Sequence, residues 1–183
     1  MGWYAMTLAD VLQITPIDAA HEADRAALID SLRSLMSGLA AQQTADGRWL
    51  TVVDFPAGPV AGNFLDTSCS AMLVYAISKA VAAGYLDAAF TSVASKAYKG
   101  ILRQLSLRPE TVAGGTAYLT ALAGIAEGQV VRSTPELYTT TTLNASNAIV
   151  TRVNPLTNDL HGLGAFLLMY EQVKRRPETV SPF

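Results

Sequence analysis

The sequence predicts an all-α protein, arranged as an α/α toroid or as part of one. Segments with apolar residues at helical spacing recur along the 183 residues, and five helices can be read from them. Amphipathic segments alternate with one that is apolar on nearly every side. That alternation indicates two concentric layers, with the amphipathic helices outside and the apolar ones inside. A plain helical bundle fits the same pattern nearly as well.

The first two predicted helices are amphipathic. The first covers residues 3–13 and ends before Pro16; its apolar stripe consists of Tyr4, Leu8 and Val11. The second covers residues 20–43, and its leucines recur at spacings of four, three and four: Leu28, Leu32, Leu35 and Leu39. This spacing is typical of a surface helix that lays one face on a core.

A turn, a short strand and a loop come next. Asp46 and Gly47 mark the turn, residues 49–53 have the composition of a strand, and prolines and glycines at 56–62 mark the loop. Trp49 lies in the strand, where packing is its simplest role.

The third predicted helix, residues 67–83, is the one that is apolar on nearly every side, so we expect it to be buried. Asp66 or Thr67 is the expected N-cap, with Asp66 favoured, and Gly84 follows the helix as the expected C-terminal stop.

The second half of the chain contains two further helices and an insertion. The fourth helix is predicted over residues 87–105 and is amphipathic again. Residues 106–157 are rich in threonine, glycine, alanine and valine, and we expect loops and short strands there. An insertion of this length in a compact domain is usually functional, or else its elements have been assigned wrongly. The last helix is predicted over residues 160–176, and residues 177–183 are expected to form a disordered tail.

Composition and charge exclude several classes of protein. Half of the residues are hydrophobic, 15% are charged, and the net charge is −2. The one basic run, 174–176, fits a solvated helix end better than a nucleic-acid site. With one cysteine, Cys69, the chain cannot form an internal disulfide, and no Cys/His spacing indicates a metal, so neither metal nor cofactor is expected. Neither a signal peptide nor an apolar run of membrane-spanning length is visible. We therefore expect a soluble chain, and we assign no cellular compartment to it.

Three motifs resemble glycoside hydrolase family 105 and its sister family 88. Residues 2–6, GWYAM, resemble the end of the families' WARxNGW segment. Residues 62–72, GNFLDTSCSAM, resemble a GNxxE-(T/A)-SxSAM segment, and residues 157–166, TNDLHGLGAF, resemble the closing NDxxGxGxF motif. The resemblance implies an (α/α)6 barrel of twelve helices, of which this chain would form about half, as a single partial domain over residues 1–183.

The resemblance also implies a chemistry. Members of these families are glycoside hydrolases that hydrate the C4=C5 double bond of unsaturated uronyl oligosaccharides, which lyases release from pectin, rhamnogalacturonan or related polymers. Their catalytic aspartate lies upstream of the GW segment and has no counterpart here, so we assign no catalytic residue. Asp10 is expected to be exposed on its helix, and Asp66 and Asp159 are expected to cap helices. The chain is therefore expected to be a fragment that is inactive alone.

Four residues are candidates for binding the oligosaccharide. Trp3 matches the second tryptophan of the families' segment and could stack on a sugar, although a core aromatic is an equal alternative. His161 is predicted at a helix N-terminus that favours an anionic uronate, although a histidine on a turn needs no ligand. Asn158 could bond a hydroxyl or carboxylate, and Tyr138 matches tyrosines that precede the closing motif.

Two other hypotheses compete with the truncated hydrolase. One is a non-catalytic half-barrel that serves as a carbohydrate-binding or oligomerisation module. A half-barrel exposes an apolar face, so a homo-oligomer formed through that face is expected. The other is an unrelated helical toroid of the cyclase type, which commonly needs zinc ligands or acidic metal motifs that this sequence lacks.

Overall fold

The structure is a computed structural model of the whole chain. It describes residues 1–53, 63–112, 115–123, 125–126, 141–143, 149–151, 155–156 and 160–175. The predicted tail at 177–183 lies outside these ranges.

Five helices form the body of the described structure, as the sequence predicts. They are α1 (Gly2–Ile14), α2 (Glu22–Ala41), α3 (Thr67–Ala82), α4 (Phe90–Leu102) and α5 (Leu160–Lys174). Every predicted helix is present, and the boundaries differ by three residues or fewer. The fourth helix ends earlier than its apolar periodicity suggests because Leu105 already belongs to a strand.

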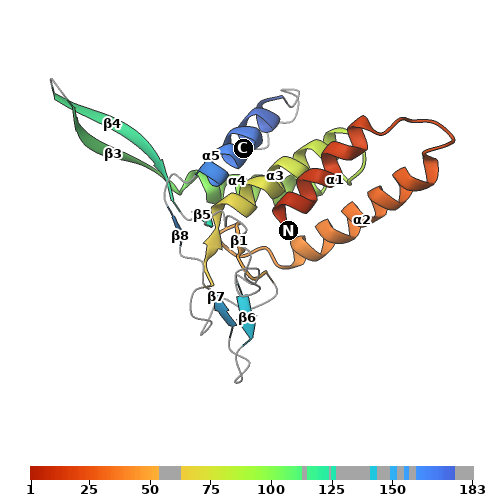
Figure 1. The fold of residues 1–183 in the computed structure, drawn as a ribbon, viewed down its shortest axis with the longest axis horizontal. Helices are drawn as coiled ribbons and strands as arrows, with labels where there is room; N and C mark the ends of the chain where they lie inside the picture. Colours follow the sequence, from red (N-terminus) through yellow and green to blue (C-terminus); the bar gives the residue numbers. More distant parts are fainter. Residues whose placement is uncertain are drawn as a thin grey trace, which may run out of the picture.

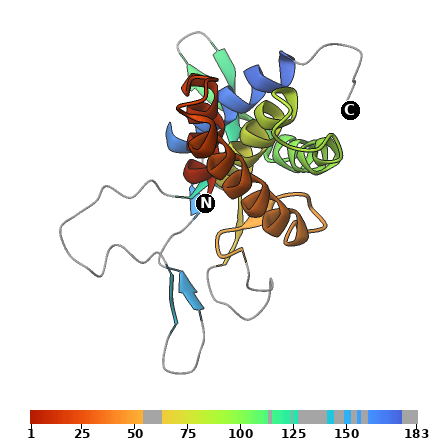
Figure 2. The ribbon, with the colours of Figure 1, turned by 90° about the vertical axis from the view of Figure 1, so that its right-hand side faces the viewer.

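Helix α3 is the centre of the fold. It packs against α1, α4 and α5, and α2 packs against α1. Figures 1 and 2 show α3 among the other helices. Twelve of its residues are buried, which confirms that the helix that is apolar on all sides is internal.

Helices α1, α3 and α5 run in the same direction. The start of α1 meets the first half of α3: a Cβ at Gly2 would lie 2.7 Å from the sulfur of Met72. The end of α1 meets the second half of α3, where Asp10 bonds Lys79. An (α/α) barrel has this arrangement, in which inner helices are parallel and the outer helices return between them. We therefore call α1, α3 and α5 the inner helices.

The strands pair in four antiparallel couples. They are β1 (Trp49–Leu50) with β2 (Leu65–Asp66), β3 (Leu105–Val112) with β4 (Gly115–Leu122), β5 (Ile125–Ala126) with β8 (Pro155–Leu156), and β6 (Thr141–Leu143) with β7 (Ile149–Thr151). All lie toward the end of the molecule at which the inner helices begin (Figure 1). The insertion thus contains a regular hairpin with strands of 8 residues each, which is longer than the short strands expected from its composition.

The strand predicted at 49–53 is shorter than expected. Only Trp49 and Leu50 pair, because their partner strand β2 has two residues and passes directly into α3. Trp49 is 0% exposed, and its indole N–H donates to the carbonyl of Leu39 at 2.6 Å. The packing role expected for Trp49 is the role it has, and the bond ties the strand to the end of α2.

A buried arginine fixes the end of α1. Arg25 on α2 donates from one guanidinium nitrogen to the carbonyls of Leu12 and Thr15, both at 2.7 Å. Its other terminal nitrogen donates to the Tyr85 hydroxyl at 3.2 Å. These carbonyls have no partner within the helix, so the arginine satisfies them and sets the angle between α1 and α2.

Candidate functional site

An open hollow lies between the N-terminal halves of α1 and α5. It has a volume of about 410 Å³ and is lined by Trp3, Met6, Leu160, Gly164, Ala165 and Leu168. The GW segment and the closing motif, which lie at opposite ends of the sequence, therefore meet in space. The inner helices begin at this end, so their N-terminal dipoles are positive toward it.

Trp3 is an exposed side chain of this hollow. It is 60% exposed, so it is not the core aromatic that was its alternative role. The neighbouring Gly2 faces the core instead, where α1 lies against Met72 without room for a Cβ. Close contact at Gly2 and the helical turn of 100° per residue together direct Trp3 away from α3. A large aromatic surface in an open, mostly apolar hollow is suited to stacking against a ring.

The structure describes little of the other three candidate binding residues. His161 lies in the first turn of α5, beside Leu160, which lines the hollow; its side chain is outside what the structure describes. Asn158 and Tyr138 lie outside the described residues, as does Asp159. The structure therefore brings together Trp3 and the helix turn that carries His161.

Asp66 caps α3, as its sequence position predicts. Its Oδ1 accepts from the backbone N–H of Cys69 at 3.0 Å and from the hydroxyl of Ser68 at 2.6 Å. The side chain is buried, and its Oδ1 forms this cap. Burial and the nearby charge of Asp66 raise the pKa of the Cys69 thiol to about 12, so this cysteine stays protonated and is no nucleophile at neutral pH.

The side chain of Asp10 is 46% exposed, as its helix position suggests, but it also has two partners on α3. Its Oδ1 accepts from Lys79 Nζ at 2.6 Å and from the Tyr75 hydroxyl at 2.8 Å, while Lys79 also donates to Tyr75 at 2.9 Å. Burial alone would lower the pKa of Lys79, but the bonds to Asp10 and Tyr75 raise it above its usual range. Lys79 therefore remains a cation, and the carboxylate is held as its partner.

The Asp10–Tyr75–Lys79 network lies at the opposite end of the inner helices from Trp3. A second hollow of about 330 Å³ adjoins it, lined by Gln13, Tyr75, Lys79, Leu168, Glu171, Gln172 and Arg175. The sequence analysis missed this network. The sequence feature that could have revealed this network is a lysine four residues after a tyrosine in an otherwise apolar helix. A lysine in a buried helix needs a partner for its charge.

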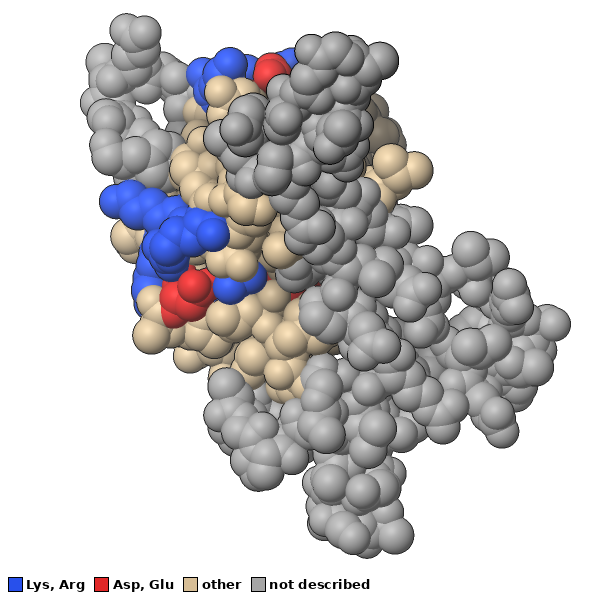
Figure 3. Space-filling model, turned by 90° about the vertical axis from the view of Figure 1, so that its left-hand side faces the viewer, with Lys and Arg blue, Asp and Glu red and all other residues tan. Residues whose placement is uncertain are grey.

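Ion pairs also join the turn after α2 to α4. Asp46 Oδ1 accepts from Arg48 Nε at 2.6 Å, and its Oδ2 lies 3.3 Å from Arg103. Figure 3 shows basic side chains gathered beside acidic ones on the side that it presents. These pairs lie on the outer helix rather than in the hollow beside Trp3, which points to a structural role.

Among the described side chains, no group of three or more His, Cys, Asp or Glu residues could hold a metal ion. Within the same part of the chain, no helix combines the length and apolarity that crossing a bilayer requires.

Comparison with known proteins places these features in a family. The model of the family described as Glycosyl Hydrolase Family 88 matches residues 1–176. The 24.9 kDa protein in picA locus of Rhizobium radiobacter is 32% identical over 178 residues, which cover 94% of this chain and 69% of that protein.

Solved structures match over nearly the whole chain. A glycoside hydrolase from family 105 of C. acetobutylicum ATCC 824 is 29% identical with a TM-score of 0.71, over 96% of this chain and 44% of that structure. A glycosyl hydrolase family 88 protein from Bacteroides vulgatus is 20% identical with a TM-score of 0.63, over 95% of this chain and 41% of that one, and shows the shared fold. The chain thus spans less than half the length of these solved structures.

Proposed function

The chain belongs to glycosyl hydrolase family 88, and on this premise we propose that it supplies the sugar-binding wall of an unsaturated uronyl hydrolase. Its substrates are oligosaccharides left by polysaccharide lyases, such as pectin or rhamnogalacturonan fragments. One observation carries the proposal: the exposed ring of Trp3 shares an open hollow with the first turns of α5.

The hollow offers two kinds of contact that such a sugar needs. The indole of Trp3 stacks on the apolar face of a pyranose ring. The N–H groups of the first turn of α5 have no partner within the helix, and the positive end of the helix dipole lies there; both favour the uronate carboxylate. His161 belongs to that turn, and Asn158 and Tyr138 complete the proposed set of hydrogen-bonding residues.

The reaction needs a proton donor that we do not assign to the described residues. An acid protonates one carbon of the double bond, water adds to the other, and the hemiketal opens to release the sugar. The described Asp66 is committed to a helix cap, and Asp10 is paired with Lys79 at the far end of the inner helices. The proposal therefore assigns binding to this chain and protonation to another part of the barrel.

The first test follows the ultraviolet absorbance of the double bond when the purified chain meets an unsaturated uronyl disaccharide. We expect no loss above background from protein with helical circular dichroism. A decay that depends on the protein would contradict the assignment of roles. The proton would then come from Asp10, Asp66 or Asp159, and changing each to Asn in turn would identify it.

The second test measures binding through tryptophan fluorescence. The chain has two tryptophans, and Trp49 is buried, so a change on adding sugar reports on Trp3. We expect saturable quenching by the unsaturated disaccharide, with the saturated disaccharide as the control for the altered ring. If neither sugar changes the emission, the sugar-binding wall is not where we place it.

The alternative is a carbohydrate-binding module without catalysis. Asp66 and Asp10 both have structural partners. Their bonding is therefore as consistent with a non-catalytic module as with the hydrolase. An experiment distinguishes the two functions: the chain is fused to the remaining helices of a family member's barrel, and binding and hydration of the unsaturated sugar are measured. Hydration then supports the hydrolase, whereas binding without hydration supports the module.

A further inference from the structure

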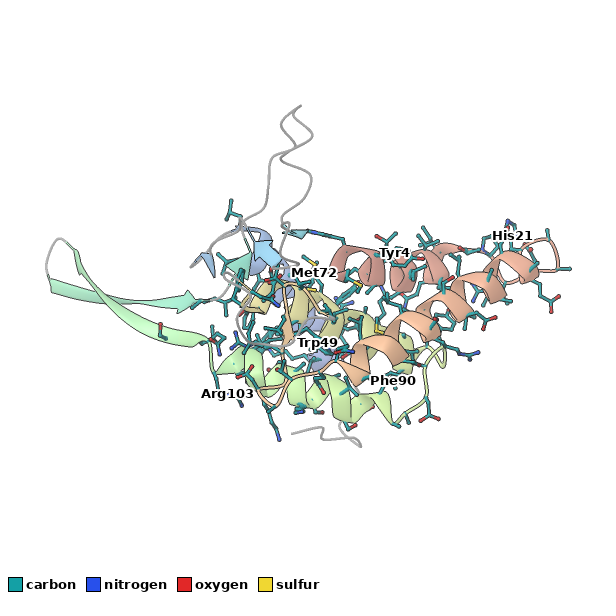
Figure 4. All side chains as sticks on the ribbon, turned by 90° about the horizontal axis from the view of Figure 1, so that it is seen from below. Tyr4, His21, Trp49, Met72, Phe90 and Arg103 are labelled. Carbon is teal, nitrogen blue, oxygen red and sulfur yellow. The ribbon has the colours of Figure 1, made fainter. Side chains whose placement is uncertain are left out.

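The second hollow, of about 330 Å³, lies toward the end of the inner helices opposite to Trp3. In Figure 4, Met72 marks the first half of α3, and Phe90 marks the start of α4, beyond the end of α3. Lys79 comes between the two in the chain, in the last turn of α3, so the hollow adjoins that end. Leu168 lines both hollows, but the polar residues of the second one take no part in the contacts proposed at Trp3.

Lys79 brings a positive charge of fixed position to this hollow. Its ammonium group donates to Asp10 at 2.6 Å and to the Tyr75 hydroxyl at 2.9 Å, and these are its hydrogen-bond acceptors in the described part of the chain. An ammonium group has three N–H donors, so one remains for a ligand. The side chain is 15% exposed, so its two partners hold it in place while it still lines the hollow. A cation that is already in position loses little freedom when an anion binds to it.

Arg175 and Glu171 add a second cation and a carboxylate at the end of α5. Both side chains line the hollow, and neither forms an ion pair or a side-chain hydrogen bond within the described residues. The guanidinium of Arg175 is a planar fork of donors that matches a carboxylate, and Glu171 accepts hydrogen bonds from hydroxyl groups. Two cations and one carboxylate therefore line the hollow. This balance favours a ligand with a single negative charge over a cation or a dianion.

Two amide side chains complete the polar part of the wall. Gln13 lies near the end of α1 and Gln172 near the end of α5, and both line the hollow. An amide carries donors and an acceptor, so it can bond a hydroxyl group in either role. The volume is at the lower end of the range for small-molecule pockets, so it suits one sugar ring rather than an oligosaccharide.

We propose that this second hollow binds the monoanion of a sugar acid, a molecule of one ring with a carboxylate and several hydroxyls. The carboxylate lies between Arg175 and the remaining N–H of Lys79, and the hydroxyls bond to Glu171 and to the two glutamines. The site is separate from the sugar-binding wall at Trp3. It does not depend on the function proposed there, and either can fail without the other.

The test is isothermal titration of the full chain with D-galacturonate. Two matched probes separate the features of this ligand: D-galactose has the same ring without the carboxylate, and acetate has a carboxylate without the ring. We expect galacturonate to bind about tenfold more tightly than either probe, because each probe lacks one of the two sets of contacts. If acetate binds as tightly as galacturonate, or if galacturonate does not bind, the proposal is wrong.

Two variants on α5 test the position of the carboxylate. Arg175→Gln should weaken the binding of galacturonate about tenfold, because it removes the charged fork from an exposed position where folding does not need it. Lys174→Gln is the matched control. It removes the neighbouring charge, but Lys174 lies over the ring of Tyr170, with its Nζ 4.5 Å from the ring centroid, and does not line the hollow. Equal losses in both variants would mean that the anion responds to net charge alone, which would overturn the proposal.

Nuclear magnetic resonance distinguishes the two hollows. The side-chain amides of Gln13 and Gln172 should shift when galacturonate is added, because both line the second hollow. A shift of the Trp3 indole N–H without a shift of these amides would place the sugar acid in the first hollow and overturn this inference. That outcome would leave the function proposed at Trp3 intact. Circular dichroism of each variant confirms that the helices are retained.

Discussion

Two tryptophans of this chain have opposite environments. Trp49 is enclosed, with its indole N–H bonded to the carbonyl of Leu39, whereas Trp3 is open to solvent beside α5. Aromatic side chains contribute large contact area in either setting. The buried one therefore stabilises the fold, and the exposed one is available to a ligand.

Replacing Trp3 should weaken sugar binding and leave folding unchanged. Trp3→Ala removes the stacking surface, and we expect about tenfold weaker binding of an unsaturated uronyl disaccharide. Trp3→Phe keeps part of that surface and should lose less. Isothermal titration calorimetry measures both, with Ile17→Ala as a control at another exposed apolar residue. Equal affinity for all four proteins would remove Trp3 from the site.

Asp46 should make the fold sensitive to acid. Burial alone would raise the pKa of its carboxyl, but the hydrogen bonds and charges of Arg48 and Arg103 lower it below the ordinary 3.8. A lowered pKa contributes stability that is present above the unfolded value and is lost as pH falls through the folded value. Asp46→Asn should lower the free energy of unfolding by about 1 kcal/mol at pH 7, and the deficit should shrink near pH 3.

A second aspartate gives the control for this pH dependence. Asp30 and Arg33 form a pair at 3.8 Å on the surface of α2, with the Asp30 side chain 76% exposed. Solvent screens such a pair, so Asp30→Asn should not measurably change the urea midpoint at either pH. If the Asp46 and Asp30 variants behave alike, the ion pairs of Asp46 contribute no more stability than a surface ion pair does.

At the scale of the helix, two glycines sit in very different surroundings. Gly38 in α2 has no atom within 4 Å of the place where a Cβ would stand, whereas a Cβ on Gly100 in α4 would lie 2.6 Å from the carbonyl oxygen of Asp46. Gly100 thus allows the turn after α2 to touch α4. Gly47 lies in the same turn at φ +99, a region that favours glycine.

Alanine at these two positions should shift stability in opposite directions. Gly38→Ala should raise the free energy of unfolding by up to about 1 kcal/mol, because alanine loses less backbone entropy in a helix. Gly100→Ala should lower it, since the turn or the helix must move. Thermal melts followed by circular dichroism measure both, because a change of 1 kcal/mol in the free energy of unfolding shifts the melting temperature by roughly 2–4 °C. A stabilised Gly100→Ala would mean that the turn does not need this contact.

At the scale of the whole molecule, the described helices form an open layer rather than a closed ring. Its inner face carries the Trp3 hollow at one end and the Asp10–Tyr75–Lys79 network at the other. Its edges carry exposed apolar side chains on α1 and α5.

The helices were predictable because each repeats its own apolar spacing. Periodicity identified all five, and the all-apolar character of residues 67–83 identified the central one. Asp66 was predictable as a cap because the residue type and the position before an apolar run suffice. The hairpin β3–β4 was not, because its pairing depends on contacts along an insertion without a clear period.

The candidate site was also predictable from the sequence only in part. Motifs selected Trp3 and His161, and they lie at the ends of α1 and α5 that meet; Asn158 and Tyr138 remain predictions outside the described residues. The pairing of Asp10 with Lys79 could not be inferred, because it links residues 69 positions apart.

The sequence by itself determined the helices, the cap of α3 and the resemblance to a family, since these depend on neighbouring residues and on short motifs. The tertiary structure alone decided which tryptophan is buried, which aspartate is paired and which faces of α1 and α5 stay open. Those outcomes depend on how helices distant in sequence pack, and a buried partner or an uncovered edge exists only once they have packed.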